Sequence, residues 1–288
     1  MNVTAKFIAE VSSNHNASLS RSLKFIDKAA ELGCWGVKFQ LFEIESLFAP
    51  EILNVSKNHR NRKRWELPID FIPDLARRCQ EKKIKFICTP FFLKAVDILY
   101  PYVDAYKIAS YEILWLDLIK ACAKTSKPII LSTGMAKIHE ISEAVHAAKS
   151  AGCIDLTLLH CVSGYPTPAE ECNLSAIKTL RNKFHCSVGW SDHSANPAVI
   201  NRAVHKWEAA TVEFHLDLDR LGNEFESKHC WLPEQILETI RSVNIGNIAD
   251  GSGEKTPMQT EYNDRDWRAD PSDGLRPLKK LRENWKQK

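Results

Sequence analysis

Short apolar runs alternate with amphipathic segments along most of the chain. The runs are apolar on both faces, which is typical of parallel strands covered by helices. The segments between them carry apolar residues at helical spacing, as residues 18–32 do through Leu19, Leu23 and Ile26. The pattern predicts strands at residues 7–11, 36–40, 85–89, 105–109, 128–132, 156–160, 186–189 and 211–214. It predicts helices at residues 18–32, 71–83, 93–100, 115–125, 138–152, 174–184, 197–207 and 232–243.

This alternation predicts an α/β protein with a single (β/α)8 TIM barrel. Eight strand–helix units over roughly 250 residues are the usual extent of that fold. A doubly wound open sheet is the alternative, but no glycine-rich nucleotide turn follows any predicted strand. We therefore expect the barrel domain at residues 1–250 and a C-terminal tail at residues 251–288. The tail is polar, yet we expect it to pack on the barrel or on a partner through Trp267, Leu275, Leu278 and Trp285.

One long insertion, residues 42–68, interrupts the repeat after the second predicted strand. It contains the basic run at residues 57–64. Such a run is either a solvated face or part of a lid over an anionic substrate, because long loops at a barrel mouth are often functional.

Composition narrows the class of protein. With 44% hydrophobic residues, the chain can bury the core of one large α/β domain. A net charge of +3 without an arginine-rich aromatic repeat gives no indication of a nucleic-acid partner. The nine cysteines are scattered without a CxxC pair, as in reduced cytosolic proteins. Neither a signal peptide at residues 1–6 nor an apolar stretch of about 20 residues is present, so we expect a cytoplasmic protein without membrane spans.

In a TIM barrel the chemistry lies at the carboxyl ends of the strands. Here these ends carry lysines, small hydroxyls, carboxylates and two histidines. In chain order they are Glu10, Lys38, Gln40, Thr89, Lys107, Ser110, Ser132, Thr133, Ser163, Tyr165, Ser191, His193, Glu213 and His215. The sequence therefore predicts one polar mouth assembled from all parts of the barrel.

Two features of this mouth point to chemistry. His193 and His215, with Glu213, are suited to a divalent metal if their strands are parallel neighbours, although each histidine alone could be an ordinary core residue. Buried lysines such as Lys38 and Lys107 need an anion, which would be a phosphate or carboxylate ligand or an internal carboxylate such as Glu10. A Schiff-base lysine is a further alternative.

Eight short motifs in order resemble the N-acetylneuraminate (sialic acid) synthase family. They are FIAEVSSNHN at residues 7–16, VKFQ at 37–40, CTP at 88–90, YKIAS at 106–110, LSTGM at 131–135, HC at 160–161, YPTP at 165–168 and GWSDH at 189–193. The resemblance covers residues 7–243. It implies the condensation of phosphoenolpyruvate with an N-acylated amino sugar.

The resemblance also implies roles for individual residues. A divalent cation, usually Mn²⁺ or Mg²⁺, would be bound by His193 and His215. Glu10 would be the acid/base group. Phosphoenolpyruvate would be bound by Lys38, Thr89, Lys107, Ser110, Ser132, Ser163 and Ser191. The sugar would face Gln40, Tyr165 and Glu213.

The chain departs from the family pattern at several positions. Ala17 replaces a glycine, and Ser163 stands where an asparagine is frequent. After His215 the family has Gly-Pro-Asp, whose aspartate contacts the sugar. Residues 221–229 lack it and offer Glu224 or Glu226, of which we favour Glu226.

The family typically carries a C-terminal antifreeze-like domain, which supplies an arginine that recognises the N-acyl group. The tail is too short for that domain, and Arg268 or Arg276 could replace the arginine unless they are simply solvated. We expect a homodimer through another face or a partner subunit.

Together these observations predict an enzyme of surface-polysaccharide biosynthesis that makes a nonulosonic acid. The alternatives are a related synthase that uses another aldose or a sugar phosphate, and a sugar-binding barrel that needs a partner for activity.

Overall fold

The computed structural model describes residues 5–285 and shows a closed barrel of parallel strands. The first residues of the predicted barrel domain, 1–4, and the last residues of the predicted tail, 286–288, lie outside the described residues. β8 pairs with β1 and closes the sheet, so the TIM-barrel prediction is confirmed and the open-sheet alternative is wrong. The strands are β1 (Lys6–Glu10), β2 (Gly36–Leu41), β3 (Lys85–Pro90), β4 (Ala105–Ile108), β5 (Ile129–Ser132), β6 (Leu156–Cys161), β7 (Ser187–Asp192) and β8 (Thr211–His215).

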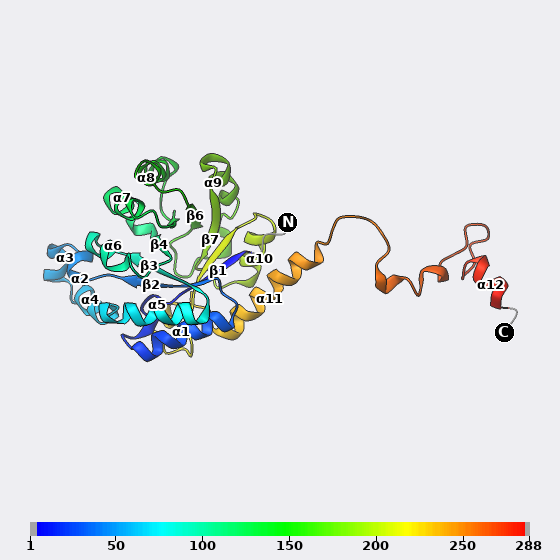
Figure 1. The fold of residues 1–288 in the computed structure, drawn as a ribbon, viewed down its shortest axis with the longest axis horizontal. Coiled ribbons are helices and arrows are strands. Elements are labelled where there is room, and N and C mark those ends of the chain that lie inside the picture. The colour runs from blue at the N-terminus through cyan, green and yellow to red at the C-terminus, as the bar shows by residue number, and fades with distance from the viewer. Residues whose placement is uncertain (1–4, 286–288) are drawn as a thin grey trace. The chain divides into compact units, whose positions relative to one another are not determined.

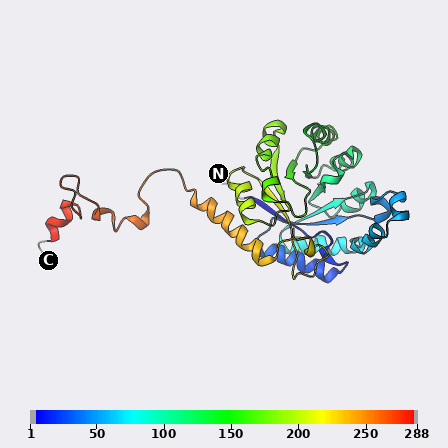
Figure 2. The ribbon, with the colours of Figure 1, turned by 180° about the vertical axis from the view of Figure 1, so that it is seen from behind.

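Helices surround the strands on the outside of the barrel (Figure 1), and Figure 2 shows the same ring from behind. The helices of the repeat are α1 (Leu19–Glu31), α5 (Ile72–Lys82), α6 (Leu93–Leu99), α7 (Leu116–Lys124), α8 (Ile138–Ser150), α9 (Ala176–Phe184), α10 (Pro197–His205) and α11 (Pro233–Ala249). Short 3-10 turns lie in the loops, among them η1 (Ser12–His15) after β1 and η6 (Phe225–Ser227) after β8.

The core consists of two apolar clusters, one outside and one inside the ring of strands. A large apolar cluster fills the space between the strands and the helices. A small one fills the inside of the barrel and consists of Ile8, Ile87, Ala105, Ile130 and Leu159. Because side chains alternate along a strand, the next inward-facing residues toward the carboxyl ends are polar. The inner apolar layer is therefore the floor of the predicted polar mouth.

The predicted strands agree with the structure to within one or two residues, except that β7 is longer at its carboxyl end. It extends from Ser187 to Asp192, whereas the apolar pattern predicts an end at residue 189. The extra residues are held by β8, with Ser191 opposite Glu213 and Asp192 opposite Phe214. This extension brings Ser191 to the mouth within the sheet itself.

The insertion at residues 42–68 is helical in part, although the sequence predicts only a loop. It contains α2 (Ile44–Leu47), α3 (Pro50–Val55), α4 (Lys57–Arg60) and the 3-10 turn η2 (Asn61–Trp65). Local interactions form these turns: proline begins α3, and the hydroxyl of Ser56 accepts from the amide of His59. The basic side chains of the run are largely exposed.

The chain divides into two compact units, residues 1–247 and 248–288. In the second unit, α12 (Lys279–Trp285) places the ring of Trp285 edge-on to that of Trp267, with centroids 5.8 Å apart. Both tryptophans remain largely exposed. Packing of the tail on the barrel or a partner stays a prediction.

No helix among residues 5–285 combines the length and the apolar character that crossing a membrane requires. All nine cysteines are free thiols, and eight of them are buried.

Candidate active site

Strand register brings the predicted residues to one mouth. Glu10 at the end of β1 lies opposite Lys38 of β2 on one side and His215 of β8 on the other. Ser191 of β7 lies opposite Glu213 of β8. Since Glu213 and His215 are two residues apart on one strand, their side chains share the inner face. The carboxylates, lysines and histidines therefore meet inside the barrel.

A buried charge network occupies the bottom of the mouth. The Nζ of Lys38 lies 2.8 Å from Oε2 of Glu10 and 3.6 Å from Oε1 of Glu213. The Nζ of Lys107 lies 3.4 Å from the same oxygen of Glu213. All four side chains are at least 96% buried. The internal pair Lys38–Glu10 foreseen as an alternative does form, and Lys107 remains beside it as a second ammonium group.

Burial and the neighbouring charges shift the pKa values of this network. Complete burial raises the pKa of Glu10, the Glu213 charge adds to the rise, and the Lys38 ammonium opposes it. For Glu213 burial acts in the same direction, but Lys107 and Lys38 outweigh it and lower the pKa. Burial lowers the pKa of Lys107, and Glu213 only partly compensates. Glu213 is thus the ionised partner of the lysines, while the upward shift of the Glu10 pKa is in the direction that favours an acid/base role.

Hydroxyl groups line the same network. The Nζ of Lys107 donates to Oγ of Ser132 over 2.8 Å. The Oγ of Ser191 donates to Oε1 of Glu213 over 3.2 Å. The Oγ1 of Thr89 is buried without a hydrogen-bond partner among the described residues. A buried hydroxyl of this kind costs free energy unless a ligand or water satisfies it, which fits a bound anion at this position.

Two further hydroxyls form a cradle around Gly134. The amide of Gly134 donates to Oγ of Ser110 over 3.0 Å. A Cβ at position 134 would lie 2.8 Å from that oxygen and would also collide with Oγ of Ser163. The Oγ of Ser163 has no hydrogen-bond partner in the described part of the chain. Glycine therefore keeps open a polar space that a small anionic group would fill.

Gln40 and Tyr165 lie on opposite sides of this region. The Nε2 of Gln40 donates to Oε1 of Glu10 over 2.6 Å and to Oγ of Ser12 over 3.2 Å. The ring of Tyr165 stacks on that of His193, with centroids 4.2 Å apart, and the residue is 43% exposed. Gln40 therefore holds the acid/base candidate, and Tyr165 forms the rim of the mouth beside the histidines.

The two predicted ligand histidines are neighbours, with ring centroids 5.3 Å apart. The Nδ1 of His193 donates to the carbonyl of Val162 over 2.8 Å, which leaves Nε2 as an acceptor. The Nδ1 of His215 faces Oε2 of Glu224 at 2.9 Å. Burial lowers the pKa of His215 to about 4 despite the Glu224 charge, so its imidazole is neutral at pH 7. Two neighbouring imidazoles oriented by such partners fit a divalent metal.

Glu224, not the favoured Glu226, is the acidic residue that reaches the site. Glu226 is exposed in η6. The amide of Glu224 donates to Oδ1 of Asn14 over 2.8 Å, and its side chain contacts His215. Glycine is required at position 222 because a Cβ there would lie 2.6 Å from Oδ1 of Asp217 and would strike Asn14. The sequence held a usable signal, since Gly222-Asn223-Glu224 keeps the glycine–x–acid spacing of Gly-Pro-Asp.

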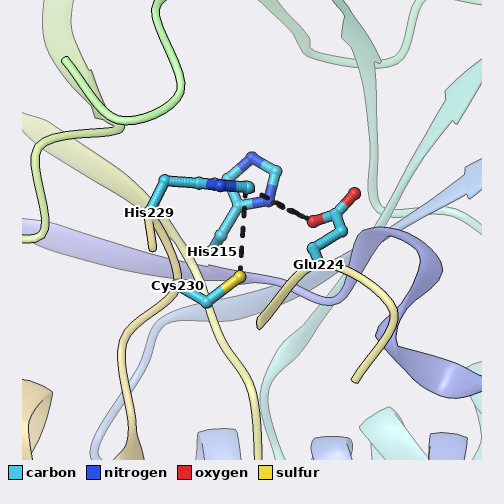
Figure 3. A group of neighbouring side chains, drawn as sticks. All are labelled: His215, Glu224, His229 and Cys230. Carbon is cyan, nitrogen blue, oxygen red and sulfur yellow. Dashed lines mark hydrogen bonds and ion pairs between the residues drawn. The ribbon is translucent and has the colours of Figure 1, made fainter. Parts of the chain in front are cut away.

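His229 and Cys230 also lie at the site, although the sequence did not single them out. Figure 3 shows both side chains beside His215 and Glu224. The ring centroid of His229 lies 4.6 Å from that of His215 and 4.9 Å from that of Tyr165. No motif of the resemblance includes these two residues, so the sequence offered no signal for them. Arg268 and Arg276 are exposed residues of the second unit, and nothing places them at the mouth.

Comparison with known proteins gives a consistent family. A sequence model of the NeuB family matches residues 25–255. An uncharacterised protein of Methanocaldococcus jannaschii is 37% identical, covering 88% of this chain and 74% of its own length. The N,N'-diacetyllegionaminic acid synthase of Campylobacter jejuni is 33% identical, covering 88% and 80%. The crystal structure of N-acetylneuraminic acid synthetase from Leptospira borgpetersenii, in complex with citrate, superposes with a TM-score of 0.80 at 32% identity, covering 93% of this chain and 92% of that one.

Proposed function

The chain belongs to the NeuB family, and on that premise we propose that it condenses phosphoenolpyruvate with an N-acylated amino sugar. The product is a nonulosonic acid, and inorganic phosphate is released. The observation that carries this proposal is the position of Lys107, a buried ammonium beside Ser132 and Glu213 at the same mouth as the histidine pair. This arrangement would bind a small, highly charged substrate and support a metal-assisted reaction of a carbonyl group.

The charges of the network suit an anionic substrate. Lys38 pairs with Glu10 at 2.8 Å, and Lys107 lies 3.4 Å from Glu213, so two buried ammonium groups lie at the mouth. The 3.4 Å contact of Lys107 is looser than the Lys38–Glu10 pair, so Lys107 can turn to an anionic ligand, and the hydroxyls of Thr89 and Ser163 lack hydrogen-bond partners among the described residues. We therefore assign the phosphate and carboxylate of phosphoenolpyruvate to these lysines and to the predicted hydroxyls Thr89, Ser110, Ser132, Ser163 and Ser191.

The residues of the chain provide binding and proton transfer. In the reaction, C3 of phosphoenolpyruvate bonds to the aldehyde carbon, water adds to C2, and the C2–O bond breaks as phosphate leaves. Glu10, with its raised pKa, takes the proton from the water, and Gln40 fixes one of its carboxyl oxygens. Tyr165, Gln40 and Glu213 face the sugar, and Glu224 takes the acidic position that the sequence assigned to Glu226.

A divalent metal, Mn²⁺ or Mg²⁺ by resemblance, would be held by His193 and His215. When bound, it would supply Lewis-acid polarisation of the sugar aldehyde. We place the enzyme in the cytoplasm, because free cysteines suit a reducing compartment. We retain surface-polysaccharide assembly as its role. A homodimer or a partner subunit remains a prediction.

The test is phosphate release from phosphoenolpyruvate with Mn²⁺, screened across aldoses that include N-acetylmannosamine, its 6-phosphate and N-acylated diamino-hexoses. We expect release that depends on one N-acylated sugar and stops after chelation. A chain that binds both ligands without releasing phosphate would instead be a binding protein. Borohydride trapping of a substrate on lysine, together with indifference to chelators, would replace this mechanism with a Schiff base.

A further inference from the structure

Four metal-ligating side chains meet on one side of His215. They are His215, Glu224, His229 and Cys230, and their donor atoms all lie within 4.8 Å of one another (Figure 3). The Oε2 of Glu224 lies 2.9 Å from Nδ1 of His215 and 3.5 Å from Nε2 of His229. The same Nε2 lies 3.9 Å from Sγ of Cys230. The resemblance assigns only His215 of this group to a metal.

The backbone holds this cluster in place. After β8 the chain forms a loop and returns beside the strand, where Leu216 and Trp231 form a parallel bridge. The amide of Trp231 donates to the carbonyl of His215 over 2.8 Å, and the amide of Asp217 donates to the carbonyl of Trp231 over 2.9 Å. His229 and Cys230 immediately precede Trp231, so these bonds fix both residues next to His215.

Glu224 and His229 direct donor atoms toward the centre of the cluster. One carboxylate oxygen of Glu224 accepts from the hydroxyl of Ser12, and the other faces both histidines. His229 is 3% exposed, and its Nδ1 has no hydrogen-bond partner among the described residues. An unpaired buried nitrogen is costly in a purely structural role, and this orientation of the ring turns Nε2 toward Glu224 and Cys230, where an ion can bind.

The spacing of the donors suits tetrahedral coordination. With metal–nitrogen and metal–oxygen bonds of about 2.1 Å and a metal–sulfur bond of about 2.3 Å, tetrahedral ligands lie roughly 3.3 to 3.6 Å apart. Three of the six donor separations are 2.9, 3.5 and 3.9 Å, on both sides of that range or within it, and all six are within 4.8 Å. Two imidazoles, one carboxylate and one thiolate are preferred by Zn²⁺ and Co²⁺, whereas Mg²⁺ prefers oxygen ligands.

We propose that His215, Glu224, His229 and Cys230 form a four-donor site for a divalent ion of the Zn²⁺ class. The thiol of Cys230 releases its proton to solvent as the sulfur–metal bond forms. The ion binds Nδ1 of His215, on the side facing Glu224.

A neutral imidazole has one lone pair, so His215 cannot serve this site and pair with His193 on a second ion at once. An ion in the four-donor site therefore competes with the metal of the proposed reaction. This consequence rests on the proposed function, whereas the binding of the ion does not.

The test uses the full chain, freed of metal by chelator and kept reduced, and titrated with Co²⁺. We expect one equivalent to produce a thiolate-to-Co²⁺ charge-transfer band and the intense visible bands of tetrahedral cobalt. One equivalent of Zn²⁺ should abolish both, and a hundredfold excess of Mg²⁺ should leave them unchanged. Bound Co²⁺ without a thiolate band in the wild-type protein would overturn the proposal, whatever the variants do.

Variants locate the site. Cys230→Ser should remove the charge-transfer band, and His229→Gln should weaken Co²⁺ binding at least tenfold. His193→Ala should keep the band. The matched control is Cys186→Ser, since Cys186 precedes the amino end of β7, away from the mouth, and this variant should bind Co²⁺ like the wild type. A band that survives Cys230→Ser, or that disappears in His193→Ala, would place the ion elsewhere.

Sugar-dependent phosphate release, measured with Mn²⁺ alone and then with added Zn²⁺, separates the two proposals. Release that Zn²⁺ inhibits supports both proposals. If the protein releases phosphate but shows no thiolate band with Co²⁺, the proposed function stands and the four-donor site is refuted. If the thiolate band appears but no sugar supports phosphate release, the four-donor site stands and the proposed function is refuted.

Discussion

Lys107 offers the sharpest test of the anion site, because its structural and ligand-binding roles can be separated. The side chain is fully buried, donates to Ser132 over 2.8 Å and lies 3.4 Å from Glu213. In Lys107→Met, Glu213 still has Lys38 as a lysine neighbour, at 3.6 Å. Breaking a buried ion pair on one side costs about 3–5 kcal/mol. Because Lys38 remains, we expect a loss of about 3 kcal/mol in the free energy of unfolding.

The double variant Lys107→Met/Glu213→Gln removes both charges and is the matched control. Lys38 keeps its close partner Glu10 at 2.8 Å, so no charge is left buried alone. We expect the double variant to recover most of the lost stability, since removing a whole buried pair is often nearly neutral. Phosphoenolpyruvate binding should not recover. A charge-assisted contact contributes about 1.5–3 kcal/mol, which corresponds to about 10- to 150-fold in the dissociation constant.

Urea unfolding gives the stability of each variant, and calorimetry without sugar gives its affinity for phosphoenolpyruvate. A double variant that regains wild-type affinity along with its stability would show that Lys107 acts only as a structural partner of Glu213. A single variant with unchanged affinity would move the anion site elsewhere.

Three further predictions test other parts of the account. Gly134→Ala should raise the KM for phosphoenolpyruvate about tenfold, the usual effect of losing one hydrogen bond to a charged group. The new methyl group would displace the hydroxyls of Ser110 and Ser163. An unchanged KM would show that these two hydroxyls do not bind the substrate. Asn14→Ala should cost about 1–3 kcal/mol in urea unfolding, since it leaves the amide of Glu224 and the carbonyl of Leu216 without their partner; an unchanged free energy of unfolding would contradict this role. Burial lowers the pKa of His15 to about 4, so the unfolded chain binds the proton first as the pH falls. The free energy of unfolding should therefore decrease between about pH 6.5 and pH 4, by up to about 3 kcal/mol. His15→Gln should lose less stability over that range, and an equal loss would show that His15 is not the titrating group.

The sequence predicts most of the barrel because its information is local. Strands buried on both faces read as apolar runs, and the inward alternation that places Ile8, Ile87 and Ile130 on the floor places Glu10, Thr89 and Ser132 above it. These positions follow once the strand register is set. The family motifs, which lie on the same strands, identify the charged residues among them.

The loop after β8 could not be predicted in this way. Glu224, His229 and Cys230 lie in a stretch without strand or helix periodicity, and their positions depend on contacts far away in the chain. Asn14, 210 residues earlier in the chain, holds the loop by accepting a hydrogen bond from the amide of Glu224. The return of Trp231 beside β8 is likewise a tertiary contact. The sequence could offer Glu224 and Glu226 as alternatives, but only the fold chooses between them.

The most direct test of the central claim follows the bridging oxygen of phosphoenolpyruvate. The substrate is labelled with ¹⁸O between C2 and phosphorus and incubated with the enzyme, Mn²⁺ and the sugar that supports turnover. If water adds at C2 and the C2–O bond breaks, the label appears in inorganic phosphate, and unlabelled oxygen from water enters the keto group of the nonulosonic acid. Label retained in the organic product, or phosphate released at the same rate without sugar, would contradict the proposed condensation.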